Sequence, residues 1–203
     1  MLSSAVRVRF TKVGSLQFIS HLDLNRTMKT VMIRAGIPIK YSEGFNPHPK
    51  MVFALPLSVG AESVTEFLDF KLDRPMAEGE LVDRLNRALP PEMRVLEAYA
   101  PTAKFTAIQY AEYRIEDEEE FSIEPLMQDT IVMMKRSKSG EKECDIKPLI
   151  FSFQKEGNAL ICVLSASPDA YLNPEYIAKL LGISDATILR TRVLLADGVT
   201  PFR

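Results

Sequence analysis

The segment Ile39–Leu57 reads IKYSEGFNPHPKMVFALPL and holds the most unusual chemistry of the chain. Between Tyr41 and Lys50 it places two aromatic residues, an asparagine, and a histidine that lies between two prolines. Proline fixes its own φ and favours extended geometry in the preceding residue, so we expect Asn46 and His48 to be held stiffly. Functional residues are common on loops. We therefore take Tyr41–Lys50, the Pro-His-Pro loop, as the candidate functional site.

Around this loop, hydrophobic periodicity predicts an order β-α-β-β-α-β for the first hundred residues. The predicted strands are Ala5–Lys12, Met51–Leu57, Val64–Leu72 and Met93–Ala100, and the predicted helices are His21–Ala35 and Ala77–Leu89. Ser20 can cap the first helix, and Gly36 can end it. This order is typical of an α+β ferredoxin-like fold, with both helices on one face of the sheet. The open face would display Arg7 and Arg9.

The same segment decides which strand comes second in the sheet. The extended, β-branched character of Ile37–Ile39 favours a strand at Ile37–Tyr41, which would bring the Pro-His-Pro loop beside His21. One pocket would then hold His21, Arg26, Tyr41, Asn46, His48 and Lys50, with Arg7 or Arg9 near its floor. If Met51–Leu57 is the second strand instead, the loop lies near the other helix end, about 20 Å away. A capping His21 and a loop histidine bonded to backbone are the structural alternative.

Pro101 begins a second unit, so we expect two domains, 1–100 and 101–203. The pattern predicts strands at Lys104–Ile115, Thr130–Arg136 and Ala186–Leu195, a hairpin of Ile146–Gln154 with Ala159–Ser165, a helix from the acidic run Glu116–Glu120 to Met127, and a short helix from Asn173 to Leu181. Ser137–Glu143 reads as a polar turn. This order suggests a degenerate ferredoxin-like repeat that carries an extra hairpin.

The composition of the 203-residue chain, with 46% hydrophobic and 26% charged residues, is that of a soluble globular protein. No segment approaches the roughly 18 apolar residues that a membrane span requires, and the first residues do not form a signal peptide. We therefore expect a cytoplasmic protein. Its two cysteines, Cys144 and Cys162, lie far apart, which argues against a metal site, an iron–sulfur cluster or a disulfide framework. We expect no cofactor.

Charge is unevenly distributed along the chain. Residues 1–57 hold eight Lys or Arg residues against Asp23 and Glu43, a net charge of +6, so the remainder carries −8. A basic region of this kind suggests an anionic partner, of which nucleic acid is the commonest, or else a solvated basic face.

The segments Val6–Phe10, Leu16–Ser63 and Glu66–Leu72 resemble the radical-SAM-linked bacterial family of unknown function, most specifically in SHLD and YSEGFNPHPK. The resemblance implies a radical S-adenosylmethionine protein as partner and no established reaction. The chain lacks the CxxxCxxC pattern that would hold the cluster of such an enzyme, so it would present a substrate to a radical enzyme acting in trans.

The favoured hypothesis is a module that binds RNA, such as transfer or ribosomal RNA, for that enzyme. The residues expected to contact RNA are Arg7, Arg9, Lys12, His21, Arg26, Tyr41, Phe45, Asn46, His48 and Lys50. Arg7, Arg9, Lys12, Arg26 and Lys50 would meet phosphates, Tyr41 or Phe45 would stack on an unpaired base, and Asn46 would read its edge.

Two alternatives remain open from the sequence. The first is a metal-independent endoribonuclease in which His21, His48 and Lys50 supply a general base, a general acid and a cation. The second is a protein–protein interaction module in which the prolines hold Phe45 as an anchor.

Overall fold

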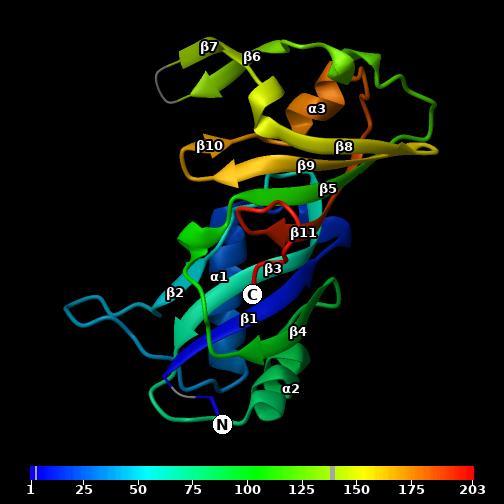
Figure 1. Ribbon diagram of the computed structural model, residues 1–203. Helices are drawn as coiled ribbons and strands as arrows, with labels where there is room; N and C mark the ends of the chain where they lie inside the picture. The colour runs from blue at the N-terminus through cyan, green and yellow to red at the C-terminus, as the bar shows by residue number, and fades with distance from the viewer. Residues whose placement is uncertain (3, 138–139) are drawn as a thin grey trace. The chain divides into compact units, whose positions relative to one another are not determined.

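The computed structural model describes residues 1–2, 4–137 and 140–203. In this part of the chain, antiparallel strands combine with three α-helices, which confirms the predicted α+β class. The chain divides into two compact units (Figure 1). Unit 1 comprises Met1–Phe105 with Arg203, and unit 2 comprises Thr106–Phe202.

Unit 1 has the element order β-α-β-β-α-β. Its elements are β1 (Ala5–Lys12), a 3₁₀ turn at Gly14–Phe18, α1 (His21–Arg34), β2 (Met51–Phe53), β3 (Ala61–Lys71), α2 (Glu78–Ala88) and β4 (Met93–Tyr99). The four strands lie side by side in the order β2-β3-β1-β4, and every neighbouring pair is antiparallel.

Helix α1 begins and ends at the residues that the sequence indicates. The Ser20 side chain accepts a hydrogen bond from the Asp23 backbone N–H at 3.1 Å and caps the helix. Gly36 follows the helix with φ near +62°, a conformation that favours glycine. The buried face of α1 consists of Leu24, Met28, Val31 and Met32, and it joins Leu81 and Leu85 of α2 in one hydrophobic core. Both helices therefore cover the same face of the sheet.

The strand register separates the two faces of this sheet. Val6 of β1 and Met51 of β2 both pair with Phe70 of β3, and all three pack in the core. Arg7 and Val52 both pair with Asp69, one residue along. Because side chains alternate along a strand, Arg7, Asp69 and Val52 share the opposite side, which we name the outer face.

The second strand differs from the favoured prediction. Ile37–Tyr41 is not a strand; within it, Ile39 makes one isolated bridge to Leu72, and Tyr41 makes one to Pro49. The second strand in chain order is Met51–Phe53, which pairs with β3 on the side away from β1. The apolar character of Ile37 and Ile39 serves burial in the core, where they are 6% and 4% exposed, and does not indicate a sheet strand.

The Pro-His-Pro loop is an excursion from one strand edge. Ile39 lies opposite Leu72 and Met51 lies opposite Phe70, so the chain leaves β3 and returns almost in register. The Lys40 N–H donates to the Lys71 carbonyl at 2.7 Å, and the Lys50 N–H donates to the Lys40 carbonyl at 3.0 Å. Figure 1 shows the intervening residues projecting from the sheet beside β2.

Unit 2 contains β5 (Tyr110–Glu116), β6 (Val132–Ser137), β7 (Gly140–Asp145), β8 (Ile150–Glu156), β9 (Ala159–Ser167), β10 (Ala170–Tyr171), α3 (Glu175–Leu180) and β11 (Thr187–Leu194), with 3₁₀ turns at Phe105–Ala107 on its boundary, Glu124–Met127 and Lys147–Leu149. Its main sheet has the order β8-β9-β5-β11, again with antiparallel neighbours, and β10 also pairs with β9. Unit 2 thus repeats the strand order of unit 1, and the β6–β7 hairpin occupies the chain position of its first helix.

Three expectations for unit 2 differ from the structure. The acidic run Glu116–Glu120 opens no α-helix, and only the 3₁₀ turn Glu124–Met127 follows it. Adjacent like charges disfavour a helix, and Pro125 cannot donate to one. The expected strand Lys104–Ile115 begins only at Tyr110. The predicted polar turn Ser137–Glu143 includes Lys138 and Ser139, which lie outside the described residues, and Gly140–Asp145 forms a strand.

Among the described helices, none combines the length and the apolar character needed to cross a lipid bilayer.

Candidate functional site

The Pro-His-Pro loop is closed by hydrogen bonds between its two arms. The Ser42 N–H donates to the His48 carbonyl at 2.8 Å, and the His48 N–H donates to the Ser42 hydroxyl at 3.1 Å. The same hydroxyl lies 2.9 Å from Nδ1 of the His48 ring. Three contacts from one serine hold the histidine backbone and ring together, so the predicted stiffness at His48 has a structural cause in addition to the prolines.

The tip of the loop presents an aromatic side chain to solvent. Phe45 is fully exposed, at 112% of the reference area, and Tyr41 is 39% exposed. Single exposed apolar side chains are common on protein surfaces, so Phe45 gains its interest from the charged groups beside it. Lys40, Lys50 and Lys71 lie at the base of the loop, and all three are exposed. The loop therefore combines an exposed ring with a cationic base.

A cavity of about 430 Å³ adjoins the loop. Its lining includes His48, Pro49, Lys50, Met51 and Val52 of the loop and β2, together with Ala5, Val6, Asp69, Phe70, Lys71 and Pro101. Val52 and Asp69 belong to the outer face by register, as do Ala5 and Lys71 two residues along. The cavity, which we name the outer-face cavity, thus has mainly apolar walls with cations at its edge and one carboxylate.

Arg7 lies on the outer face, as predicted, but it is not displayed there. Its side chain is 1% exposed and forms a two-point ion pair with Asp69, with Nε–Oδ1 at 2.7 Å and Nη2–Oδ2 at 2.8 Å. Nη2 also donates to the Ala103 carbonyl at 2.9 Å, and the Phe105 ring lies 4.4 Å from the guanidinium carbon. The segment after β4 covers this part of the face, so Arg7 cannot contact a phosphate.

Lys12 and Arg9 also differ from the expected phosphate contacts. Lys12 is 2% exposed, and its Nζ donates to the Leu16 carbonyl at 2.9 Å. Arg9 pairs with Glu97 at 2.6 Å and keeps about a third of its side chain exposed. The basic charge of residues 1–57 is therefore partly neutralised in the folded protein, because Arg7 and Arg9 pair with acidic residues beyond residue 57.

Arg26 is exposed on α1, where it pairs with Asp23 at 3.2 Å. The Asp23 pKa is lowered from its usual range, chiefly by the hydrogen bond from Ser20. The contacts of Asp23 with Ser20 and with Arg26 both lie at the start of α1. Arg26 is therefore explained as an exposed side chain that stabilises the first turn of the helix.

The two histidines have different surroundings. The His21 ring packs edge-on against Phe53, with 5.3 Å between ring centroids, and Phe53 contacts the core. His48 lines the outer-face cavity with Val52 and Asp69. The predicted common pocket of His21, Arg26, Tyr41, Asn46, His48 and Lys50 is therefore wrong. Of these six residues, the outer-face cavity includes His48 and Lys50.

Several residues of the site were missed by sequence reasoning. Lys71, Asp69 and Val52 join it because β2 and β3 pair in a particular register. Lys40 directly precedes the loop and was detectable from its position, whereas the other three depend on long-range pairing that local patterns do not specify.

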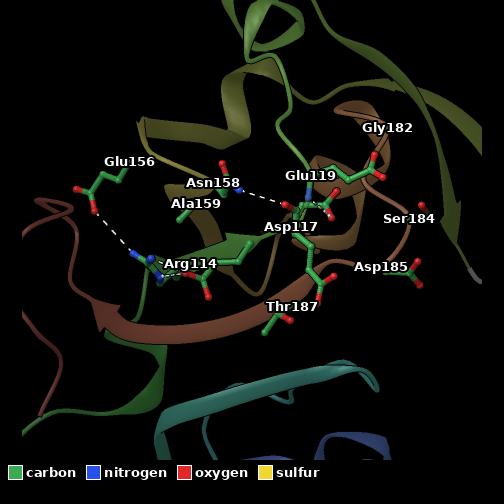
Figure 2. A pocket seen from close by; sticks show the side chains of 12 residues that line it. Arg114, Asp117, Glu119, Glu156, Asn158, Ala159, Gly182, Ser184, Asp185 and Thr187 are labelled. Carbon is green, nitrogen blue, oxygen red and sulfur yellow. Dashed lines mark hydrogen bonds and ion pairs between the residues drawn. The ribbon is translucent and has the colours of Figure 1, made fainter.

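Unit 2 contains a larger cavity of about 730 Å³ with a different character (Figure 2). Acidic side chains dominate its lining: Glu116, Asp117, Glu118, Glu119, Glu156 and Asp185. Figure 2 shows Arg114 directed toward Glu156, 3.7 Å away, and Asn158 donates to the Glu118 carbonyl at 3.2 Å. Its negative charge disfavours an anionic ligand.

No group of three or more His, Cys, Asp or Glu residues suited to a metal ion occurs in residues 1–2, 4–137 and 140–203.

Comparison with known proteins gives one family. The profile of a family described as an uncharacterized protein conserved in bacteria (DUF2344) matches residues 5–175, most of the chain. The matched region includes the Pro-His-Pro loop and residues 5–105 of unit 1. A search of curated proteins found no match.

Proposed function

Since the chain belongs to this uncharacterized bacterial family (DUF2344), whose description names no activity, we propose its function from the site: it is an RNA-binding module without catalysis of its own. We further propose that it presents RNA, such as transfer or ribosomal RNA, to a radical S-adenosylmethionine protein. The resemblance in SHLD and YSEGFNPHPK supports that partner. An RNA substrate would place the protein in the cytoplasm.

One observation carries the proposal: a hydrogen-bonded loop holds Phe45 fully exposed above three exposed lysines, Lys40, Lys50 and Lys71. Proteins that bind single-stranded nucleic acid combine cations that follow the backbone with aromatic rings on which bases stack. A stiff loop loses little conformational entropy on binding, so more of the contact energy becomes affinity. The set of RNA contacts proposed now is Lys40, Tyr41, Phe45, Asn46, His48, Lys50 and Lys71.

We also propose that both units derive from a ferredoxin-like plan. The strand orders β2-β3-β1-β4 and β8-β9-β5-β11 support it, as do the two helices that cover one face of the first sheet. In this view unit 2 is a degenerate copy whose first helix has been replaced by the β6–β7 hairpin.

The endoribonuclease alternative has less support. General acid–base cleavage needs both histidines within hydrogen-bond reach of one phosphodiester. His21 packs against Phe53, whereas His48 faces the outer-face cavity. Incubation of the pure protein with labelled RNA in EDTA should leave the RNA intact; cutting that disappears in His48→Ala would restore the alternative.

The proposal is tested by fluorescence anisotropy with a labelled single-stranded RNA over a salt series. The double variant Lys40→Ala/Lys50→Ala removes two cations from the loop base. Each phosphate contact on a single strand contributes about 0.7 to the salt slope, so the slope should fall by about 1.4. Affinity at low salt should fall for all RNA sequences alike, because phosphate contacts do not read bases.

The matched control is Lys104→Ala/Lys179→Ala, which removes two exposed lysines that belong neither to the loop nor to its base. It should leave the salt slope unchanged. Equal slopes for the two double variants, or no retention of RNA by the unaltered protein, would overturn the proposed function. Co-purification of a partner protein after RNase treatment, lost in Phe45→Ala, would instead identify the loop as a protein-docking element.

A further inference from the structure

We propose that the outer-face cavity holds one unpaired nucleotide of the bound RNA and selects a base that carries an exocyclic amino group. This inference rests on the proposed function, since it assigns a base-reading site to the same surface. The residues that carry it are Val52, Asp69, Lys50 and Lys71.

The cavity suits a planar ring. Its volume of about 430 Å³ lies within the range of small-molecule sites, and its lining is largely apolar. Val52 is 59% exposed on β2, and Pro49 and Pro101 lie at other parts of the lining. A base splayed out of a single strand can cover these groups, and apolar and aromatic surfaces are what the face of a base prefers.

Asp69 supplies the polar contact. Its carboxylate keeps 28% of its side-chain area exposed although both oxygens accept hydrogen bonds from Arg7. A carboxylate oxygen has more than one acceptor position, so each can accept a further hydrogen bond. Arg7 is buried and holds the carboxylate in one orientation. Asp69 is thus a fixed acceptor in the cavity wall, as an amino-group reader requires.

The acceptor determines which bases bind well. A carboxylate can accept from the amino groups of cytosine, adenine or guanine, whereas uracil has no amino group. Arg7 already donates to both oxygens along one edge of the carboxylate, so a base adds a single amino N–H from outside that edge. We therefore expect cytosine, adenine and guanine to bind more tightly than uracil.

The cations fit the phosphate end of a nucleotide. Lys50 and Lys71 both line the cavity and are exposed, so their ammonium groups can reach a phosphate while water still surrounds them. The contrast with the acidic cavity of unit 2 is clear, because that cavity would repel a phosphate. Charge and apolar lining together favour a nucleotide over a neutral or cationic ligand.

The test uses the full chain and the four nucleoside 5′-monophosphates, with affinities measured by isothermal titration calorimetry. GMP should bind about tenfold more tightly than UMP. Guanosine should bind roughly tenfold more weakly than GMP, because it lacks the charged group that the lysines contact. Equal affinity for all four nucleotides, or no binding of any, would overturn base selection in this cavity.

A second variant separates the cavity from the loop. Val52→Trp fills the cavity from an exposed strand position and should abolish GMP binding; Val59→Trp adds the same side chain at another exposed position and should not. RNA that binds with the expected loop-dependent salt slope, while Val52→Trp leaves GMP binding unchanged, would overturn this inference and leave the proposed function standing. GMP binding that Val52→Trp removes, in a protein that does not retain RNA, would overturn the proposed function and keep the nucleotide cavity.

Discussion

Arg7 and Asp69 form a two-point ion pair across β1 and β3, with Nε–Oδ1 at 2.7 Å and Nη2–Oδ2 at 2.8 Å. The arginine is buried, whereas the carboxylate borders the outer-face cavity. Arg7 therefore holds the Asp69 carboxylate in place, while its own buried side chain cannot contact a ligand in the cavity. The pair connects the stability of unit 1 to the orientation of the one carboxylate in the cavity wall.

We predict that Asp69→Ala lowers the free energy of unfolding by about 3–5 kcal/mol, because it leaves a buried guanidinium without its carboxylate. Urea denaturation followed by circular dichroism measures this change. Asp83→Ala, which removes an exposed aspartate of α2, is the control and should cost far less. The double variant Arg7→Met/Asp69→Leu should be more stable than Asp69→Ala alone. Equal stability of Asp69→Ala and Asp83→Ala would contradict the role of the pair.

Ser42 is predicted to keep the Pro-His-Pro loop closed. Ser42→Ala removes the hydroxyl that contacts both the backbone and the ring of His48. Each lost hydrogen bond contributes about 1 kcal/mol locally, so the His48 amide should exchange with deuterium several-fold faster. RNA affinity should fall as well, because a looser loop loses more entropy on binding.

The control for this loop is Ser42→Thr, which keeps the hydroxyl. It should retain slow exchange at His48 and near-normal RNA affinity. Unfolding by urea should be unchanged in both variants, because the loop is mostly exposed. Slow exchange at His48 in Ser42→Ala would show that the prolines alone hold the loop.

Phe45 is predicted to contribute to binding and not to stability. Its side chain is fully exposed, so Phe45→Ala removes no packing from the folded protein. If the ring stacks on a base, the variant should lose about 1–3 kcal/mol of binding free energy to single-stranded RNA. Phe18→Ala, at a residue that is 68% exposed on another surface, is the matched control. Comparable RNA affinities for the two variants would argue against stacking at Phe45.

Protonation of Glu112 in unit 2 is predicted to lower the free energy of unfolding at acid pH. Its carboxylate accepts hydrogen bonds from Arg192 at 2.8 Å and from the Thr191 hydroxyl at 2.6 Å, and these contacts lower its pKa below the ordinary value of 4.5, the Arg192 bond most strongly. A lowered folded-state pKa stabilises the protein above pH 4.5, and that contribution is lost as the pH falls through the folded-state value.

Urea denaturation at neutral pH and in steps below pH 4.5 measures this dependence. Glu112→Gln should be less stable than the unaltered protein at neutral pH, and its stability should decrease less on acidification. Asp197 also has a lowered pKa, caused mainly by the hydrogen bond that it accepts from the Thr200 hydroxyl, so Asp197→Asn is a suitable comparison at an exposed turn. An unchanged acid slope in Glu112→Gln would assign the loss of stability to other carboxylates.

Local sequence patterns were sufficient for elements that depend on near neighbours. Ser20 caps α1 by accepting a hydrogen bond from the backbone N–H of Asp23, three residues further along. The helical spacing of Leu24 and Met28 determines which face of the helix is buried. The β8–β9 hairpin turns at Gly157, between the two strands that were predicted to form it. These features follow from contacts within a few residues, which a single sequence specifies.

The acidic run at Glu116–Glu120 shows the limit of such patterns. A negative charge suits a helix start, but five consecutive acids also repel one another along a helix. The chain instead uses these residues beside Arg114 and Asn158 at the edge of a cavity. Competition between two local rules was resolved by tertiary contacts.

The sequence by itself determined that Tyr41–Lys50, with its histidine between two prolines, forms a loop outside the helices and strands, because proline geometry and polarity act locally. Only the tertiary structure decided which side chains surround it. Arg7 and Arg9 lie 62 and 88 residues from the acids that neutralise them, and one change in strand register moves Lys71 and Asp69 to or from the cavity. Alternation within one strand indicates which of its faces is buried, but the partner strand and the residues that pair with it depend on contacts far along the chain.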